Sequence, residues 1–142
     1  NYGSAKMGVI GLMNTLVIEG SKYGIKVNSL APTAGTQMLE GLVDEAAFEI
    51  LRPESATAGL LVLCAEDAPN RLILCAGAGA YASAHIYETE GIYLPPGQQT
   101  PENVMAQLDR INARDGELEL TAGFNQTNRF VEKARKALGT DS

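Results

Sequence analysis

NYGSAKMGVIGLMNTLVIEGSKYG, residues 1–24, and IKVNSLAP, residues 25–32, decide how this chain folds. Apolar residues at helical spacing predict a helix over residues 3–23, and the glycine that follows is a common helix stop. The β-branched run after it predicts a strand over residues 25–31, ended by a proline. A helix followed closely by such a strand is half of a βαβ unit, which places ligands beyond the carboxyl end of the strand.

Tyr2 and Lys6 lie four residues apart at the start of this helix. Side chains at that spacing share one helix face, so a phenol and an ammonium become neighbours. A fixed positive charge and a helix N-terminus both favour the phenolate, and such a pair can exchange protons near neutral pH. On spacing alone, the same two residues also fit a solvated helix start.

Residues 1–32 resemble the short-chain dehydrogenase/reductase family through YGSAK, the helix after it and IKVNSLAP. Within that family, residues 28–38, 77–81 and 91–95 are similar to the 3-hydroxyacyl-CoA dehydrogenase domain of peroxisomal-type multifunctional enzymes. The resemblance implies an α/β fold: the C-terminal part of a Rossmann-like doubly wound parallel sheet, with a helical C-terminal extension. It also implies that the parent enzyme oxidises a secondary alcohol or reduces a ketone, for example on a 3-hydroxyacyl-CoA.

The resemblance also assigns site residues. Tyr2 exchanges the proton at the substrate oxygen, while Lys6 assists the phenol and holds the ribose hydroxyls of NAD or NADP. Pro32, Thr33 and Thr36 follow the strand in a loop that runs along the nicotinamide in the family, with the assisting hydroxyl assigned to Thr36. The family more often has glycine at the position of Thr33. Most other cofactor contacts are expected upstream of residue 1, and the isolated chain is expected to be inactive without them.

The apolar residues of the first helix cover much of its circumference, which predicts burial on more than one side. Gly8 and Gly11 each cost about 1 kcal/mol inside a helix, and close approach of another backbone would explain them. We therefore expect either a complementary N-terminal dehydrogenase half or a homo-oligomer through this helix. A non-catalytic oligomerisation or interaction module derived from the fold is the alternative function.

Composition narrows the class of protein. The 142 residues are 45% hydrophobic and 20% charged, as in one soluble globular unit. The net charge of −6 argues against nucleic acid or an anionic membrane as partner. No apolar run reaches the roughly 20 residues of a membrane span, and no targeting signal is visible, so we expect a cytoplasmic protein, or a peroxisomal one if the source is eukaryotic. Cys64 and Cys75 lack metal-ligand spacing, and no metal site is expected.

The middle of the chain continues the α/β order. A flexible loop from Gln37 leads to a short helix ending near Leu51, which fits a substrate lid and an ordinary surface helix equally well. A second helix runs to Cys64. The apolar run LILCA at residues 72–76 predicts a buried parallel strand, and GAGA at residues 77–80 predicts a tight turn.

The last part of the chain is predicted to be mostly helical. Residues 82–87 and 91–94 resemble a hairpin. Helical patterns cover residues 101–111 and 126–138. We therefore expect residues 1–97 to be the C-terminal part of a dehydrogenase domain, and residues 98–142 to be a helical extension of the same domain.

Overall fold

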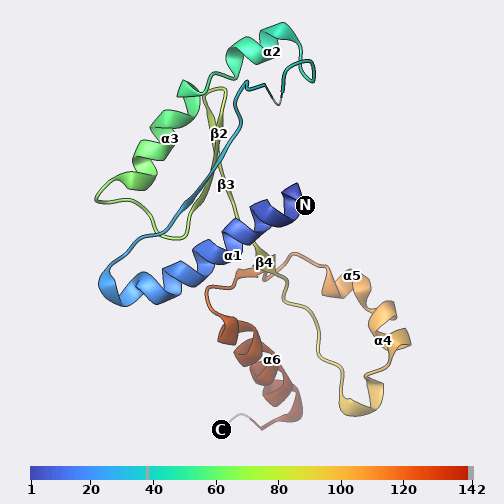
Figure 1. The fold of residues 1–142 in the computed structure, drawn as a ribbon. Helices are drawn as coiled ribbons and strands as arrows, with labels where there is room; N and C mark the ends of the chain where they lie inside the picture. Colours follow the sequence, from blue (N-terminus) through green and yellow to red (C-terminus); the bar gives the residue numbers. More distant parts are fainter. Residues whose placement is uncertain (38, 141–142) are drawn as a thin grey trace. The chain divides into compact units, whose positions relative to one another are not determined.

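The computed structural model describes residues 1–37 and 39–140. They form two compact units, the first from Asn1 to His85 and the second from Ile86 onward (Figure 1). The sequence placed the start of the helical extension later, at residue 98. A boundary between compact units does not by itself define a domain, so the domain assignment stays a prediction.

Helix α1 runs from Tyr2 to Gly20 and continues as a single 3-10 turn, η1, from Ser21 to Tyr23. Gly24 ends it with a φ of 69°, the left-handed conformation in which glycine commonly terminates a helix. The predicted helix and its stop are therefore confirmed. Met13 is buried, but most of the other apolar side chains of α1 are exposed in the described chain. The apolar surface that we expected to be buried on several sides is open here.

Strand β1 spans Ser29–Pro32 and so begins later than predicted. The residues just before it belong to no strand, and asparagine side chains make hydrogen bonds there with the backbone. The Val27 amide donates to Asn70 Oδ1 at 2.8 Å, and Asn28 Oδ1 accepts from the Leu72 amide at 2.9 Å. The predicted start at Ile25 was therefore wrong, because side-chain bonds precede the ladder.

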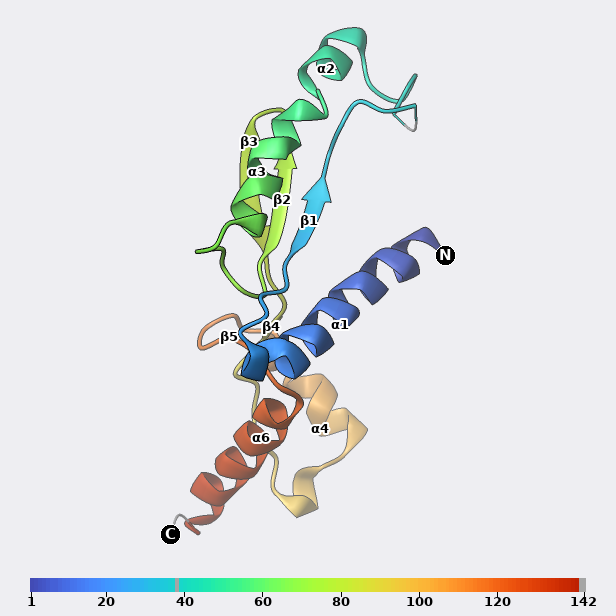
Figure 2. The ribbon, with the colours of Figure 1, turned by 60° about the vertical axis from the view of Figure 1, so that its left-hand side comes forward.

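Strand β2, Ile73–Gly77, pairs in parallel with β1, with Leu30 opposite Leu74. This confirms the predicted parallel pair, but only Ala76 of β2 is buried in the described chain, so the full burial expected for this strand is not observed. Helix α3, Glu54–Cys64, contacts both strands. In both views α3 and α1 lie on opposite sides of the strands (Figures 1 and 2), as in an α/β sheet with helices on both faces.

A third strand, β3, Ala80–Ala84, pairs antiparallel with β2 and gives the sheet the order β1-β2-β3. The predicted hairpin between residues 82–87 and 91–94 was therefore wrong. Ala78 and Gly79 have φ values of 52° and 75°. Positive φ at both central residues is typical of a two-residue hairpin turn, which folds the next segment directly back on β2.

Helix α2, Glu45–Ile50, begins where the Asp44 side chain accepts a hydrogen bond from the Ala47 amide at 2.7 Å. An aspartate at this position satisfies a free N–H group of the first turn. The predicted loop before it includes Met38, which lies outside the described residues. Neither the lid nor the surface-helix interpretation of this segment is tested by the fold.

The second unit contains a small antiparallel pair and several short helices. Its elements are β4 (Tyr87–Glu88), η2 (Pro96–Gln98), α4 (Pro101–Ala106), α5 (Leu108–Ile111), β5 (Leu118–Glu119) and α6 (Gly123–Leu138). The single helix predicted over residues 101–111 is divided at Gln107, whose φ of −108° leaves the helical region. Within the described ranges, no helix is long and apolar enough to cross a membrane.

Four charged side chains, Glu88, Glu90, Arg129 and Lys133, form an ion cluster that attaches α6 to the segment around β4. Arg129 contacts Glu88 at 2.9 Å and Glu90 at 3.0 Å, and Lys133 Nζ lies 2.8 Å from Glu90 Oε1. Hydrogen bonding from Lys133 and then from Arg129 holds the pKa of Glu90 below its ordinary value. The ion cluster is therefore strongest when Glu90 is ionised.

Candidate functional site

The first turn of α1 carries the predicted pair. Lys6 Nζ lies 5.3 Å from the centroid of the Tyr2 ring. At that distance the ammonium is attracted by the negative face of the ring. Tyr2 is 63% exposed, so its hydroxyl is open to a partner molecule. The structure thus brings Tyr2 and Lys6 together on one helix face, as their spacing predicted.

The N-terminus of α1 adds to the electrostatics of this pair. Asn1 precedes the helix, and its side chain makes no capping bond to the first turn. The first amide groups of a helix lack intrahelical partners, and they carry the positive end of the helix dipole. A negatively charged group of a bound molecule is therefore favoured beside this first turn.

Helix α1 and strand β1 run in opposite directions and are joined near the middle of the helix. Ser29 Oγ donates to Met13 Sδ at 3.2 Å. Gly20 lies so close to Ile25 that an added Cβ would be 3.0 Å from the Ile25 Cβ. Figure 2 shows the N-terminal part of α1 diverging from the strand.

The predicted cofactor loop starts at the carboxyl end of β1. Pro32 is the last residue of β1, and the amide of Thr33 donates to the carbonyl of Ala76 at 2.8 Å. Gly77 approaches so closely that an added Cβ would lie 2.5 Å from the Thr33 carbonyl oxygen. Thr36 accepts a backbone hydrogen bond that closes a turn. The loop is thus fixed against β2, in the position where parallel sheets bind ligands.

Among the residues that the structure describes, no hydrogen bond, ion pair or ring contact joins Tyr2 or Lys6 to Thr33 or Thr36. Their roles in catalysis and cofactor binding stay predictions. The residue types fit a nicotinamide cofactor, since an ammonium can bond ribose hydroxyls and a threonine can bond a carboxamide. Within the described ranges, no cluster of three or more His, Cys, Asp or Glu side chains could hold a metal ion.

Sequence reasoning missed a link between α1 and the loop before β2. Arg71 Nε donates to Asn14 Oδ1 at 2.9 Å in a partly buried position. Arg71 also has a φ of 65°, which is uncommon for a residue with a side chain. Its amide donates to the Val27 carbonyl at 2.9 Å. No residue pattern signals such a conformation, and the link joins segments that are far apart in the sequence.

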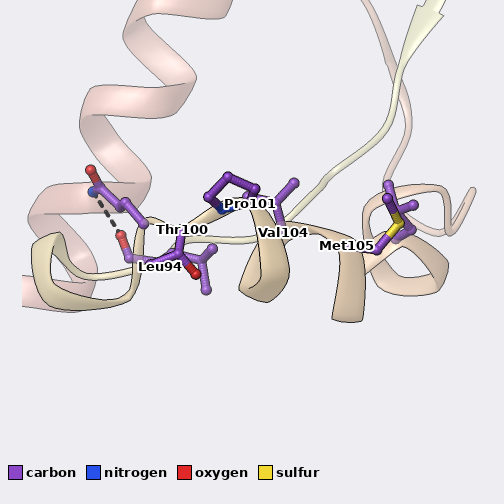
Figure 3. Close-up of a pocket in the computed structure, with 7 residues that line it drawn as sticks. Leu94, Thr100, Pro101, Val104 and Met105 are labelled. Atoms are coloured by element: carbon purple, nitrogen blue, oxygen red, sulfur yellow. Dashed lines mark hydrogen bonds between the residues drawn. The ribbon is translucent and has the colours of Figure 1, made fainter.

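The second unit contains an apolar hollow of about 500 Å³ (Figure 3). Its lining residues are Leu94, Gln99, Thr100, Pro101, Val104, Met105 and Leu108. Gln99 Nε2 donates to the Leu94 carbonyl at 2.9 Å, and this hydrogen bond satisfies the side-chain amide of Gln99 in the lining. None of these lining side chains is ionisable near neutral pH, so the hollow can accept an apolar group but cannot supply an acid or a base.

No protein-family model matches the chain. The chain is 37% identical over 102 residues to a Mycobacterium tuberculosis protein whose name places it among the short-chain dehydrogenases/reductases, covering 70% of this chain and 36% of that protein. It is 38% identical over 114 residues to the mouse peroxisomal multifunctional enzyme type 2, covering 78% of this chain and 16% of that enzyme.

The fold gives a matching result. The structure of the full-length peroxisomal multifunctional enzyme type 2 from Drosophila melanogaster superimposes with a TM-score of 0.80 and 28% identity, over 96% of this chain and 25% of that one. The chain therefore spans only between 16% and 36% of the length of these relatives. Sequence and fold together confirm the resemblance: the chain belongs with the short-chain dehydrogenases/reductases of the type found in peroxisomal multifunctional enzymes.

Proposed function

We propose that the chain is part of an NAD(P)-dependent dehydrogenase that oxidises a secondary alcohol or reduces a ketone, with 3-hydroxyacyl-CoA thioesters as the substrate class. The observation that carries the proposal is the Lys6 ammonium 5.3 Å from the ring of an exposed Tyr2 at the positive end of α1. A relative named acetoacetyl-CoA reductase from Synechocystis, 50% identical over 32 residues and 22% of this chain, supports an acyl-CoA substrate.

In this proposal Tyr2 moves the proton. Its hydroxyl donates to the substrate carbonyl oxygen during reduction, and its phenolate accepts the hydroxyl proton during oxidation. Lys6 stabilises the phenolate and binds the ribose of the cofactor. A nicotinamide held by Lys6 and the loop after β1 would supply hydride chemistry at the carbon that carries this oxygen. Pro32, Thr33 and Thr36 orient the carboxamide.

The isolated chain is proposed to be inactive without a cofactor-binding half. β1 is the edge strand of its sheet in the described chain, and a further strand could pair with its free edge. The exposed apolar side chains of α1 offer a second surface for the same half or for another copy. We place the protein in the cytoplasm, or in the peroxisome if its source is eukaryotic.

Substitution of Tyr2 tests the proposal in a protein that joins this chain to its dehydrogenase half. Tyr2→Phe removes only the hydroxyl, so turnover should fall by a factor of about 10² to 10⁴ while NAD(H) affinity persists. Lys6→Ala should lower both turnover and cofactor affinity. Steady-state kinetics and cofactor fluorescence titration give the two quantities.

The chain offers a matched control. Tyr23 is 70% exposed and has Lys22 Nζ 4.8 Å from its ring, a similar cation and ring pair away from the helix start. Tyr23→Phe and Lys22→Ala should leave turnover unchanged. Near-normal turnover in Tyr2→Phe would show that the proton moves through another group.

The exposed apolar surface of α1 favours one second candidate, a non-catalytic interaction module. Such a module would bind neither NAD nor NADP. Titration of both cofactors, with and without the N-terminal half, separates the two functions. Absence of cofactor binding in both states would leave the interaction module as the function.

A further inference from the structure

We infer that Arg71 is a positioning residue for the Tyr2 and Lys6 pair, acting through Asn14 on the direction of α1. The inference rests on the proposed function, because it concerns how the same site is oriented. Arg71 Nε donates to Asn14 Oδ1 at 2.9 Å, and the contact is partly buried. Asn14 lies near the middle of α1, beside the Met13 contact with Ser29.

Arg71 is itself held by the backbone on which the site depends. Its amide donates to the Val27 carbonyl at 2.9 Å, just before β1, and β2 begins two residues later. The Arg71 side chain therefore connects α1 to the points where both parallel strands start. A rotation of the helix relative to the sheet must break or stretch this hydrogen bond.

The first half of α1 acts as a lever. Every residue from Tyr2 to Val9 is exposed in the described chain, so within it α1 is held to the sheet only through its second half, where Met13 and Asn14 make their contacts; the proposed N-terminal half would add contacts to the first half. At 1.5 Å per residue, Tyr2 lies roughly 18 Å from Asn14 along the helix axis. A tilt of about 3° at Asn14 then moves Tyr2 by about 1 Å, and a displacement of that size can cost about a hundredfold in rate.

The φ of 65° at Arg71 provides a variant that separates positioning from stability. Glycine adopts this conformation more readily than arginine, so Arg71→Gly removes the side chain while keeping the backbone in a favourable state. Arg71 makes further interactions besides its bond to Asn14, so a single substitution does not isolate the link. A double-mutant cycle with Asn14→Ala does isolate it.

The test compares Arg71→Gly, Asn14→Ala and the double variant in the protein that contains both dehydrogenase halves. We expect kcat to fall ten- to a hundredfold in each single variant and the KM of the cofactor to rise, because Tyr2 and Lys6 move together, while the KM of the alcohol or ketone substrate and the thermal midpoint stay nearly unchanged. The double variant should lose little more than either single one. Asn14→Asp keeps the acceptor for the Arg71 guanidinium and should retain most of the wild-type kcat.

The outcomes distinguish this inference from the function on which it rests. An active wild-type protein whose variants keep full kcat, or lose kcat additively, overturns the positioning role alone. If Asn14→Ala and Arg71→Gly lose kcat and their thermal midpoints also fall clearly below that of the wild type, the link is merely structural, and this result also overturns the positioning role. A wild-type protein that contains both halves and has no dehydrogenase activity overturns the proposed function, and the positioning role with it.

Discussion

Replacing Gly77 with alanine should displace the predicted cofactor loop and destabilise the first unit. A Cβ on Gly77 would lie 2.5 Å from the Thr33 carbonyl oxygen and 2.9 Å from the Thr33 Cβ, whereas ordinary contacts begin near 3.4 Å. Overpacking of this kind costs about 1–3 kcal/mol. The hydrogen bond from the Thr33 amide to Ala76 lies beside the clash, and its loss adds about 0.5–1.5 kcal/mol.

Urea unfolding of Gly77→Ala should therefore show a free energy of unfolding lower by about 1.5–4.5 kcal/mol. Gly3→Ala is the matched control, because an added Cβ there meets nothing within 4 Å and lies in the first turn of a helix. That control should be neutral or more stable by up to about 1 kcal/mol. A loss below about 0.5 kcal/mol in Gly77→Ala would contradict the close packing of the loop against β2.

Three further outcomes follow from other parts of the chain. The pKa of Glu90 is lowered in the folded state, so its ion pairs stabilise the fold above the ordinary glutamate pKa of about 4.3 and lose this effect as the pH falls through the lower pKa of the folded state. The difference in thermal midpoint between wild type and Glu90→Gln should therefore shrink as the pH falls below about 4.3. Gly79→Ala should lower the free energy of unfolding in urea by about 1–2 kcal/mol, because the φ of Gly79 is 75° and an alanine there is strained although an added Cβ meets no neighbour. Gly97→Ala is the control and should be neutral, because an added Cβ there also meets no neighbour and the φ of Gly97 is not positive. If another backbone packs on α1 at Gly11, Gly11→Ala should weaken the association of the chain with its partner or with a second copy in sedimentation equilibrium. Unchanged association would show that no backbone packs on α1 at this position.

Local signals predicted the elements that local chemistry controls. The helix from Tyr2 ends at Gly24 because glycine tolerates the left-handed conformation that the stop requires. The apolar run near Leu74 forms a strand in parallel with β1, as its composition predicts. The Tyr2 and Lys6 pair was predictable for the same reason, since a spacing of four residues on a helix brings two side chains onto the same face.

Elements that depend on tertiary contacts were not predictable. β1 starts at Ser29 rather than Ile25 because Asn28 and Asn70 bond the backbone from outside the ladder. The pairing of β3 with β2 depends on positive φ at Ala78, an uncommon conformation for alanine that the sequence does not signal. The contact between Arg71 and Asn14 likewise depends on a backbone conformation and on folding across the chain.

The arrangement of the sheet explains why the proposed site needs a further surface. β1 has β2 on one side only, and α3 and α1 approach the strands from opposite sides. Parallel sheets occur almost only where both faces are covered, yet Leu30 and Leu74 are only half-buried in the described chain. A strand added at the free edge of β1 would cover the side on which the first half of α1 diverges. If that strand were parallel to β1, its carboxyl end would lie at the same edge of the sheet as the loop that begins at Thr33, which is where parallel sheets bind ligands.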